Sequence, residues 1–266
     1  MTAKRPTESQ KVAAERINTM STDAKGCEPS VVPSDTFVPI FVLSRDRVTS
    51  LQQVLQSYNR TLSSPSEIII LDHFSTYPPM LEYLRELSSS GVRVHALKSP
   101  LWKDALKESG FVIQDYLAAH PHAAFYVFTD SDIALVRSSP DILLFFAGLL
   151  RSCKELNVVG PHLQISDIPD SYADRKKVLL IENKYWSDVP NMATWNGVGY
   201  HVSRNPIDTT FAMRRRDLHF ARLQNPCFRT FAPFAAVHVD WYYNTSFLPD
   251  DKIWYLNHSQ PNVNHW

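Results

Sequence analysis

The sequence predicts an α/β fold in which helices flank a mixed, mainly parallel sheet, and three observations support this prediction. Four short, almost continuously apolar runs lie in the first half of the chain, which is typical of buried parallel strands. Stretches with apolar residues at helical spacing separate these runs. The chain has 266 residues, of which 44% are hydrophobic, so it is long enough to bury a substantial core.

Each predicted element follows from one of these patterns. The predicted strands are 38–43, 67–71, 92–97 and 124–129, and the predicted helices between them are 49–58, 78–88 and 104–119. Three strand-helix units followed by a fourth strand favour parallel pairing, because each helix must return the chain to the same edge of the sheet. In the second half we expect a helix at 140–156, strands at 158–160, 199–203 and 208–212, and a loop-rich stretch over 161–197.

Charge and composition exclude several classes of partner. The 27 Lys and Arg residues balance the 27 Asp and Glu residues, so nothing favours a nucleic acid or an anionic membrane. The longest apolar run, Ile142 to Leu150, is too short to cross a bilayer, and the first residues lack the apolar core of a signal peptide. Cys27, Cys153 and Cys227 are scattered singly, which favours a reducing compartment. We therefore expect a soluble, cytoplasmic protein.

The sharpest local signal is the segment from Tyr126 to Asp132, an apolar strand that ends in two carboxylates. Side chains alternate along a strand, so Asp130 and Asp132 can reach a common point where the strand ends. Two carboxylates there repel each other unless a cation lies between them. Oxygen ligands suit Mg²⁺ or Mn²⁺, which commonly keep positions open for phosphate oxygens. The alternative interpretation is that Asp-Ser-Asp only forms a turn.

Polar residues that suit a nucleotide follow the first two strands as well. Ser44 and Arg45 follow the first strand and Asp72 follows the second, at the edge where open sheets bind ligands. Over residues 37–240 this arrangement resembles the glycosyltransferases of the GT-A fold, whose Asp-x-Asp binds a metal and a nucleotide diphosphate sugar. Within it, the sequence IIILDHFST (68–76) is similar to the second-strand signature of family 2 type enzymes. This similarity implies that Asp72 contacts the nucleotide base.

The resemblance extends into the second half of the chain. The segments 195–200 and 205–212 look like a segment of bacterial glycosyltransferase-like proteins, in which a histidine and an aromatic pair follow downstream. The matching histidine here is His238, and the resemblance implies that it is a third metal ligand. An imidazole ligand shifts the expected metal from Mg²⁺ toward Mn²⁺. An ordinary, partly buried histidine is the alternative.

The remaining candidates are assigned by position and chemistry. Asp208, at the start of a predicted strand, is the carboxylate that we expect to take the proton of an acceptor hydroxyl, although a cap or turn is the alternative. Asp167, Asp170 and Asp188 compete with it. The predicted nucleotide-binding residues are Ser44, Arg45, Asp72, Lys98, Asp130 and Ser131, and the predicted sugar or acceptor contacts are Trp195, Asn196 and Trp241.

These residues together predict a metal-dependent, hexosyltransferase-like glycosyltransferase. It would move a sugar from a nucleotide diphosphate sugar, with a UDP-sugar as the expected donor, to a hydroxyl of a glycan or glycoconjugate. We expect a flexible N-terminal arm (1–35) and a single GT-A-like catalytic domain (36–266), with a nucleotide-binding half (36–135) and a loop-rich acceptor-binding half (136–266). One alternative is a nucleotidyltransferase, which lacks support because no glycine-rich loop follows the first strand. The other is a non-catalytic module that binds nucleotide sugars or carbohydrate.

Overall fold

A mixed sheet lies at the centre of the molecule. The structure, a computed structural model, describes residues 28–136, 141–187, 190–208 and 210–259. Within these ranges nine strands form the sheet, in the order β3-β2-β1-β4-β9-β6-β10-β8-β7, and β5 and β11 form a small second sheet. In the large sheet β8 and β9 run opposite to the other strands. The predicted mixed, mainly parallel sheet is therefore confirmed.

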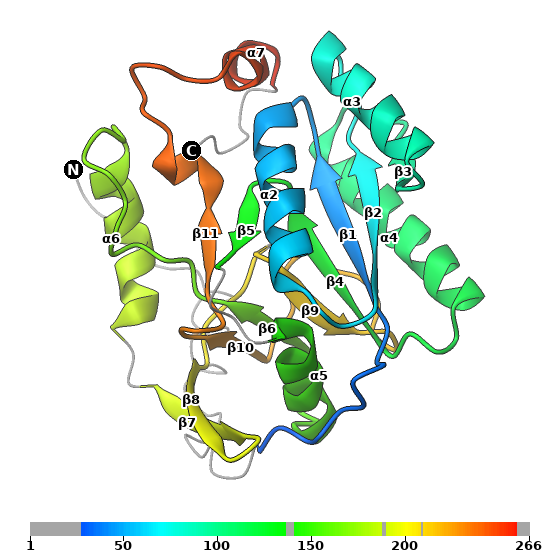
Figure 1. Ribbon diagram of the computed structural model, residues 1–266, viewed down its shortest axis with the longest axis vertical. Coiled ribbons are helices and arrows are strands. Elements are labelled where there is room, and N and C mark those ends of the chain that lie inside the picture. The colour runs from blue at the N-terminus through cyan, green and yellow to red at the C-terminus, as the bar shows by residue number, and fades with distance from the viewer. Residues whose placement is uncertain (1–27, 137–140, 188–189, 209, 260–266) are drawn as a thin grey trace, which may run out of the picture.

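The first half consists of alternating strands and helices, as the sequence predicts. The elements are β1 (Val38–Ser44), α2 (Val48–Thr61), β2 (Ser66–Asp72), α3 (Pro78–Ser89), β3 (Arg93–Ala96), α4 (Trp102–Ala119) and β4 (Phe125–Asp130). β1 pairs in parallel with both β2 and β4, and β2 pairs in parallel with β3. Figure 1 shows these strands side by side with their helices.

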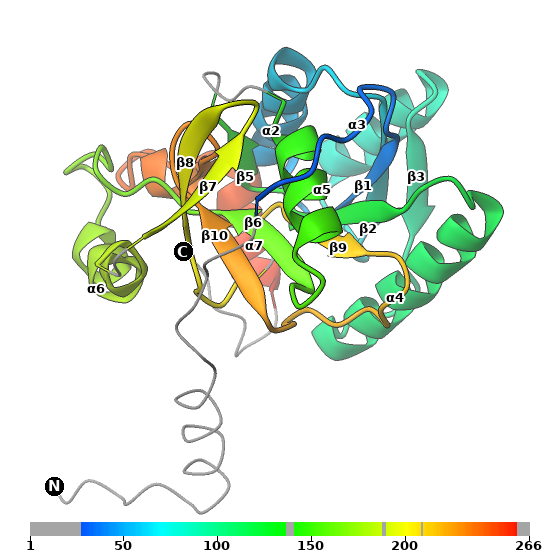
Figure 2. The same ribbon diagram turned by 90° about the horizontal axis from the view of Figure 1, so that it is seen from below.

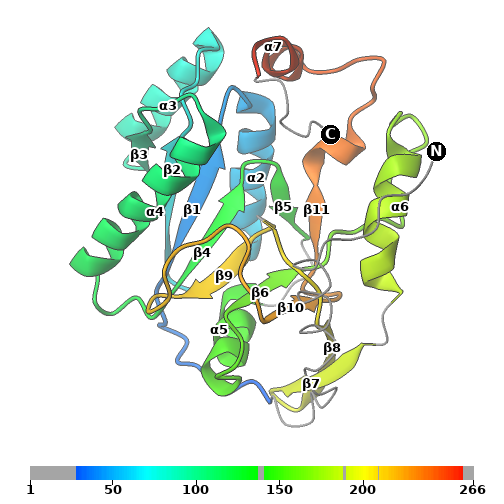
Figure 3. The same ribbon diagram turned by 180° about the vertical axis from the view of Figure 1, so that it is seen from behind.

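Side chains of β1 alternate between two apolar layers, one on each face of the sheet. Val38, Ile40 and Val42 pack with α2, α3 and α5 on one face. Phe41 and Leu43 pack with α4 on the other face. The view from behind in Figure 3 shows α4 in front of the strands. Every residue of β1 is buried, as expected for a strand that is covered on both faces.

The second half contains more regular structure than the sequence predicts. Its elements are β5 (Ile133–Leu135), α5 (Ile142–Ser152), β6 (Val158–Pro161), α6 (Arg175–Trp186), β7 (Asn191–Trp195), β8 (Val198–Ser203), β9 (Ala212–Arg215), β10 (Cys227–Thr230), β11 (Ala236–His238), the 3-10 helix η1 (Val239–Tyr242) and α7 (Asp250–His258). Figure 2 shows α6 and the β7-β8 hairpin on the side of the molecule away from α4.

Two expectations for the second half need correction. The strand expected at 208–212 is wrong, because β9 begins only at Ala212 and pairs antiparallel with β4 and β6. The stretch 161–197 contains α6 and β7 rather than loops alone. Helix α6 buries only Val178 and Glu182, so its sequence carries little apolar periodicity.

Ser30, in the segment before β1, forms hydrogen bonds with α5. The backbone N–H of Ser30 donates to the Gly148 carbonyl oxygen (3.2 Å) and to Ser152 Oγ (2.7 Å), both in α5. Ser30 therefore lies against α5, and the flexible N-terminal arm (1–35) stays a prediction. Residues 1–27 of the predicted arm lie outside the described residues.

Two properties bear on the expected environment. Cys227 is free and buried, whereas Cys153 is disulfide-bonded. The expectation of a reducing compartment rests on isolated thiols, and the disulfide of Cys153 does not agree with it. In the part of the chain that the structure describes, no helix combines the length and the apolar character needed to span a membrane.

Candidate active site

The carboxyl ends of β1, β2 and β4 form one edge of the sheet. The pairing register places Ser44 opposite Asp72 and Leu43 opposite Asp130, so the three strands end at the same level. Ligands of open α/β sheets bind beyond this edge. The predicted residues Ser44, Asp72 and Asp130 are therefore close to one another, as the sequence indicates.

Asp132 and His238 meet because two short strands pair across the chain. Asp132 lies in the turn after β4, immediately before β5, and the antiparallel register of β5 with β11 places Ile133 opposite His238. The backbone N–H of Val239 donates to the Asp132 carbonyl oxygen (2.7 Å). His238 Nε2 then lies 3.7 Å from Asp132 Oδ2.

A divalent cation fits this pair of side chains. Asp132 Oδ1 and His238 Nδ1 are buried and have no hydrogen-bond partner among the described residues. A carboxylate oxygen and an imidazole nitrogen are ligands that Mn²⁺ accepts. Ligand atoms of Asp132, His238 and Asp240 all lie within 4.8 Å of one another. Asp130 is not a member of this group, and its role as a metal ligand stays a prediction.

Asp240 differs from Asp132 because two positively charged side chains, those of Arg47 and Lys252, already pair with its carboxylate. Its carboxylate is 2% exposed, accepts a hydrogen bond from Arg47 and accepts another from Lys252 Nζ at 2.7 Å. Burial alone would raise the pKa of Asp240, but the charges of Arg47 and Lys252 hold it far below its usual range. We therefore assign Asp240 to the support of the site and not to its metal ligands.

The loops after β1 and β2 are joined by a buried carboxylate. Asp46 has a φ of 52° and accepts hydrogen bonds from the backbone N–H groups of Thr76 (2.5 Å) and Tyr77 (2.7 Å). Phe74 is also in the left-handed region, with a φ of 57°, and its side chain is 43% exposed. Non-glycine residues in this region store strain and cluster at functional sites. This edge of the sheet therefore contains two strained backbone positions.

Ser44, Arg45 and Asp72, which are predicted nucleotide-binding residues, lie at this edge of the sheet. Arg45 donates to the Pro100 carbonyl oxygen (3.0 Å), and the Ser44 hydroxyl is buried without a hydrogen-bond partner among the described residues. Burial, with a smaller contribution from the charge of Asp46, raises the pKa of Asp72 although hydrogen bonds from Ser75 lower it. Lys98 is exposed beyond β3, and nothing in the structure assigns it to the site.

The predicted base, Asp208, forms an ion pair. Both of its carboxylate oxygens accept hydrogen bonds from Arg222, the second from Nη2 at 3.1 Å. The guanidinium also lies over the ring of Trp102, with 4.8 Å between its carbon and the ring centroid. The sequence does not point to Arg222, because no local motif surrounds it, and the same holds for Arg47 and Lys252.

Two of the predicted sugar contacts have structural roles instead. Trp195 is 8% exposed and packs on Phe145 with ring centroids 5.4 Å apart, so it belongs to the core. Asn196, with a φ of 50°, and Gly197 form the two-residue turn of the β7-β8 hairpin. Figure 1 shows this hairpin at the end of the molecule away from α7. Trp241 is 1% exposed and stacks on His238 at 4.7 Å, where it can orient that ring.

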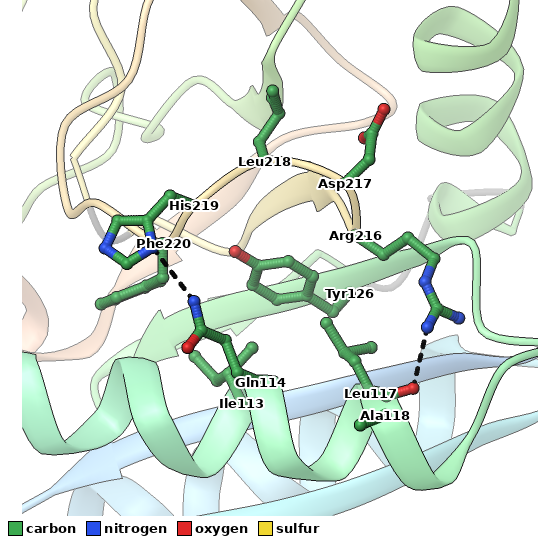
Figure 4. A pocket seen from close by; sticks show the side chains of 10 residues that line it. All are labelled: Ile113, Gln114, Leu117, Ala118, Tyr126, Arg216, Asp217, Leu218, His219 and Phe220. Carbon is green, nitrogen blue, oxygen red and sulfur yellow. Dashed lines mark hydrogen bonds between the residues drawn. The ribbon is translucent and has the colours of Figure 1, made fainter.

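A separate pocket of about 330 Å³ lies at the other end of β4. Figure 4 shows the ring of Tyr126 beneath the segment after β9, with Gln114 bonded to His219 (3.0 Å). None of the residues predicted for the active site lines this pocket. It is therefore distinct from the edge of the sheet described above.

Comparisons with known proteins add a likeness of fold. No family model matches the chain, and no curated protein matches it. Among solved structures, a Pyrobaculum calidifontis mannosyltransferase in complex with GDP-Man and Mn²⁺ is 16% identical over 59% of this chain and 43% of its own, with a TM-score of 0.39. The S. aureus protein TarS is 13% identical over 76% of this chain and 36% of its own, with a TM-score of 0.45.

A third neighbour is glucosyl-3-phosphoglycerate synthase from Mycobacterium tuberculosis in complex with phosphoglyceric acid. It is 14% identical over 68% of this chain and 57% of its own, with a TM-score of 0.39. The chain therefore spans between about a third and three fifths of the lengths of these neighbours. At this identity the likeness concerns the fold alone.

Proposed function

We propose that this protein is a metal-dependent glycosyltransferase. It moves a hexose or similar sugar from a nucleotide diphosphate sugar, a UDP-sugar in the simplest case, to a hydroxyl of a glycan or glycoconjugate. The observation that carries the proposal is the pair Asp132 and His238, with 3.7 Å between Oδ2 and Nε2 and an unpartnered buried oxygen on Asp132. This pair lies at the edge of the sheet where nucleotides bind.

The residues of the site divide between metal and nucleotide. Asp132 and His238 would hold Mn²⁺ or Mg²⁺, with Asp130 as a further predicted ligand, and the bound ion would stabilise the charge that grows on the leaving diphosphate. Asp72 and Ser44 supply polar groups for the nucleotide at the ends of β2 and β1. Arg47 and Lys252 supply positive charge behind the metal ligands, where they also fix Asp240.

The experiment that tests this proposal is isothermal titration of the protein with UDP, GDP and CDP. Each nucleotide is titrated once with Mn²⁺ and once with EDTA. We expect UDP to bind in the presence of Mn²⁺ and to lose its affinity in EDTA. Selective binding of GDP would preserve the enzyme class and change the donor, whereas the absence of nucleotide binding under both conditions would refute the proposal.

A turnover assay separates the enzyme from its alternatives. A glycosyltransferase releases UDP from a UDP-sugar, slowly with water and faster with an acceptor. A binding module would bind UDP and release none. A nucleotidyltransferase would instead consume a nucleoside triphosphate and release pyrophosphate.

A further inference from the structure

Several contacts fix the position of Arg222. Its backbone carbonyl oxygen accepts a hydrogen bond from Arg214 Nη2 (3.0 Å), and Arg214 is fully buried in β9. The segment that leads to it is also anchored, because Phe220 packs on Phe128 with ring centroids 4.8 Å apart. Figure 4 shows this segment passing over α4. The guanidinium rests on Trp102.

The positive charge of Arg222 interacts with more than one carboxylate. Burial tends to lower the pKa of Arg222, but the charges of Asp130 and Asp208, and more weakly that of Asp132, raise it above its usual value. The charge of Arg222 therefore interacts with Asp208, which it contacts directly, and with the acidic end of β4. The side chains of Arg222 and Asp208 are 30% and 49% exposed, so an anion from solvent can reach both.

These contacts lead to an inference that rests on the proposed function. We propose that Arg222 is a latch on Asp208: it binds the Asp208 carboxylate in the protein without donor, and the diphosphate of a nucleotide donor takes over the guanidinium and releases the carboxylate. A bidentate guanidinium suits a phosphate as well as it suits a carboxylate. The two anions compete for one cation, so donor binding and a free Asp208 become coupled.

The released carboxylate then has a role in an inverting transfer. The acceptor oxygen forms a bond to the anomeric carbon of the donor sugar, and its proton passes to Asp208. The bond between that carbon and the diphosphate oxygen breaks, and its electron pair stays on the diphosphate, beside Arg222. The latch therefore withholds the base until a donor is present.

The test compares substitutions on the two sides of the ion pair. In titrations with Mn²⁺ and either UDP or inorganic pyrophosphate, we expect Asp208→Asn to bind about threefold more tightly than the wild type, because a competing, partly exposed ion pair is removed. We expect Arg222→Gln to bind at least about tenfold more weakly, because a charge-assisted pair of hydrogen bonds is lost. In turnover, Asp208→Asn should lower kcat and leave KM unchanged or lower.

A second ion pair of the same type provides the control. Arg204 lies 3.7 Å from Glu155 and over the ring of Phe228, at 5.4 Å, so it resembles Arg222 in exposure, partner and stacking. Glu155→Gln and Arg204→Gln should leave both affinities at the wild-type value. Circular dichroism and thermal unfolding establish that every variant is folded.

The outcomes separate the latch from the proposed function. If the wild type binds UDP and folded Asp208→Asn binds it with equal or lower affinity, the latch is refuted and the glycosyltransferase stands. If pyrophosphate binds with the expected order of affinities and no nucleotide binds, the anion latch stands and the proposed donor is refuted. If neither ligand binds the wild type, both proposals are refuted.

Discussion

At the scale of single residues, Asp130 and Asp132 are close in sequence, but only Asp132 forms a group with His238 and Asp240 among the described residues. Asp132 faces His238 across the β5-β11 pair. Asp130 is the last residue of β4, and its negative charge raises the pKa of Arg222. The alternation rule of a strand applies only while the strand continues, and here the chain turns directly after Asp130. The test of the metal site therefore begins with Asp132, which lies against His238.

Substitution of Asp132 should remove the metal and spare the fold. We expect Asp132→Asn to lower the affinity for Mn²⁺ by about 100-fold or more, because loss of a ligand should cost at least as much as loss of its supporting contacts. His238→Gln should act in the same direction. Direct titration with Mn²⁺ measures both. Asp115→Asn, on the exposed surface of α4, is the control, and an Asp132→Asn protein with wild-type affinity would exclude this pair as the metal site.

At the scale of elements, a side chain of helix α7 caps the N-terminus of helix α2. The first residue before α2, Arg47, provides no side-chain cap. Asp251 of α7 replaces that cap, because its carboxylate accepts hydrogen bonds from the backbone N–H (2.8 Å) and the hydroxyl (2.9 Å) of Thr49. The N-terminus of a helix offers unpaired N–H groups and favours a negative charge. Two elements far apart in the chain thus share one cap.

Removal of this shared cap should destabilise the molecule and loosen α7. We expect Asp251→Ala to lower the free energy of unfolding by about 1–2 kcal/mol, which is the usual cost of losing a cap. Hydrogen exchange in α7 should become faster. The neighbouring Asp250 is exposed and contributes only its charge at the N-terminus of α7, so Asp250→Ala should cost no more than about 0.5 kcal/mol. Equal effects of the two substitutions would show that general charge, and not the cap, accounts for the loss.

The sequence predicts those elements whose signals are local. β1 and β4 are almost continuously apolar and are buried on both faces, so their positions and their parallel pairing follow from pattern alone. The pairing of β5 with β11 joins residues about a hundred positions apart, such as Ile133 and His238, and no local pattern encodes it. The same is true of Arg222, whose partner Asp208 lies in an irregular segment.

The hairpin turn shows a different kind of error. Asn196-Gly197 between two short apolar runs is a strong signal for a two-residue turn, and the φ values of 50° and 78° are those that such a turn requires. The resemblance to glycosyltransferases led us to expect a sugar contact there instead. A physical signal from the backbone was available in the sequence and would have placed Trp195 in the core.

At the scale of the whole molecule, a buried histidine makes stability depend on pH. His162 is fully buried, its Nε2 lies 2.9 Å from Ser203 Oγ, and its ring packs on Phe231 with centroids 4.2 Å apart. Burial, with a smaller contribution from the charge of Arg229, lowers the pKa of His162 from 6.5 to about 3. Between these two values the unfolded chain binds a proton that the folded protein excludes. The stabilising effect is therefore complete above pH 6.5 and decreases as the pH falls toward 3.

Unfolding by urea at pH 7 and pH 5 measures this effect. We expect the wild type to lose about 2 kcal/mol of unfolding free energy through His162 over this interval, since each pH unit below the unfolded pKa contributes about 1.4 kcal/mol. His162→Gln can keep a hydrogen bond to Ser203 and cannot titrate, so its loss should be smaller by that amount. His95→Gln, at an exposed position of β3, should keep the wild-type dependence. If His162→Gln loses as much stability as the wild type, the proton is taken up elsewhere, and His73, whose pKa burial lowers to about 4, becomes the next residue to substitute.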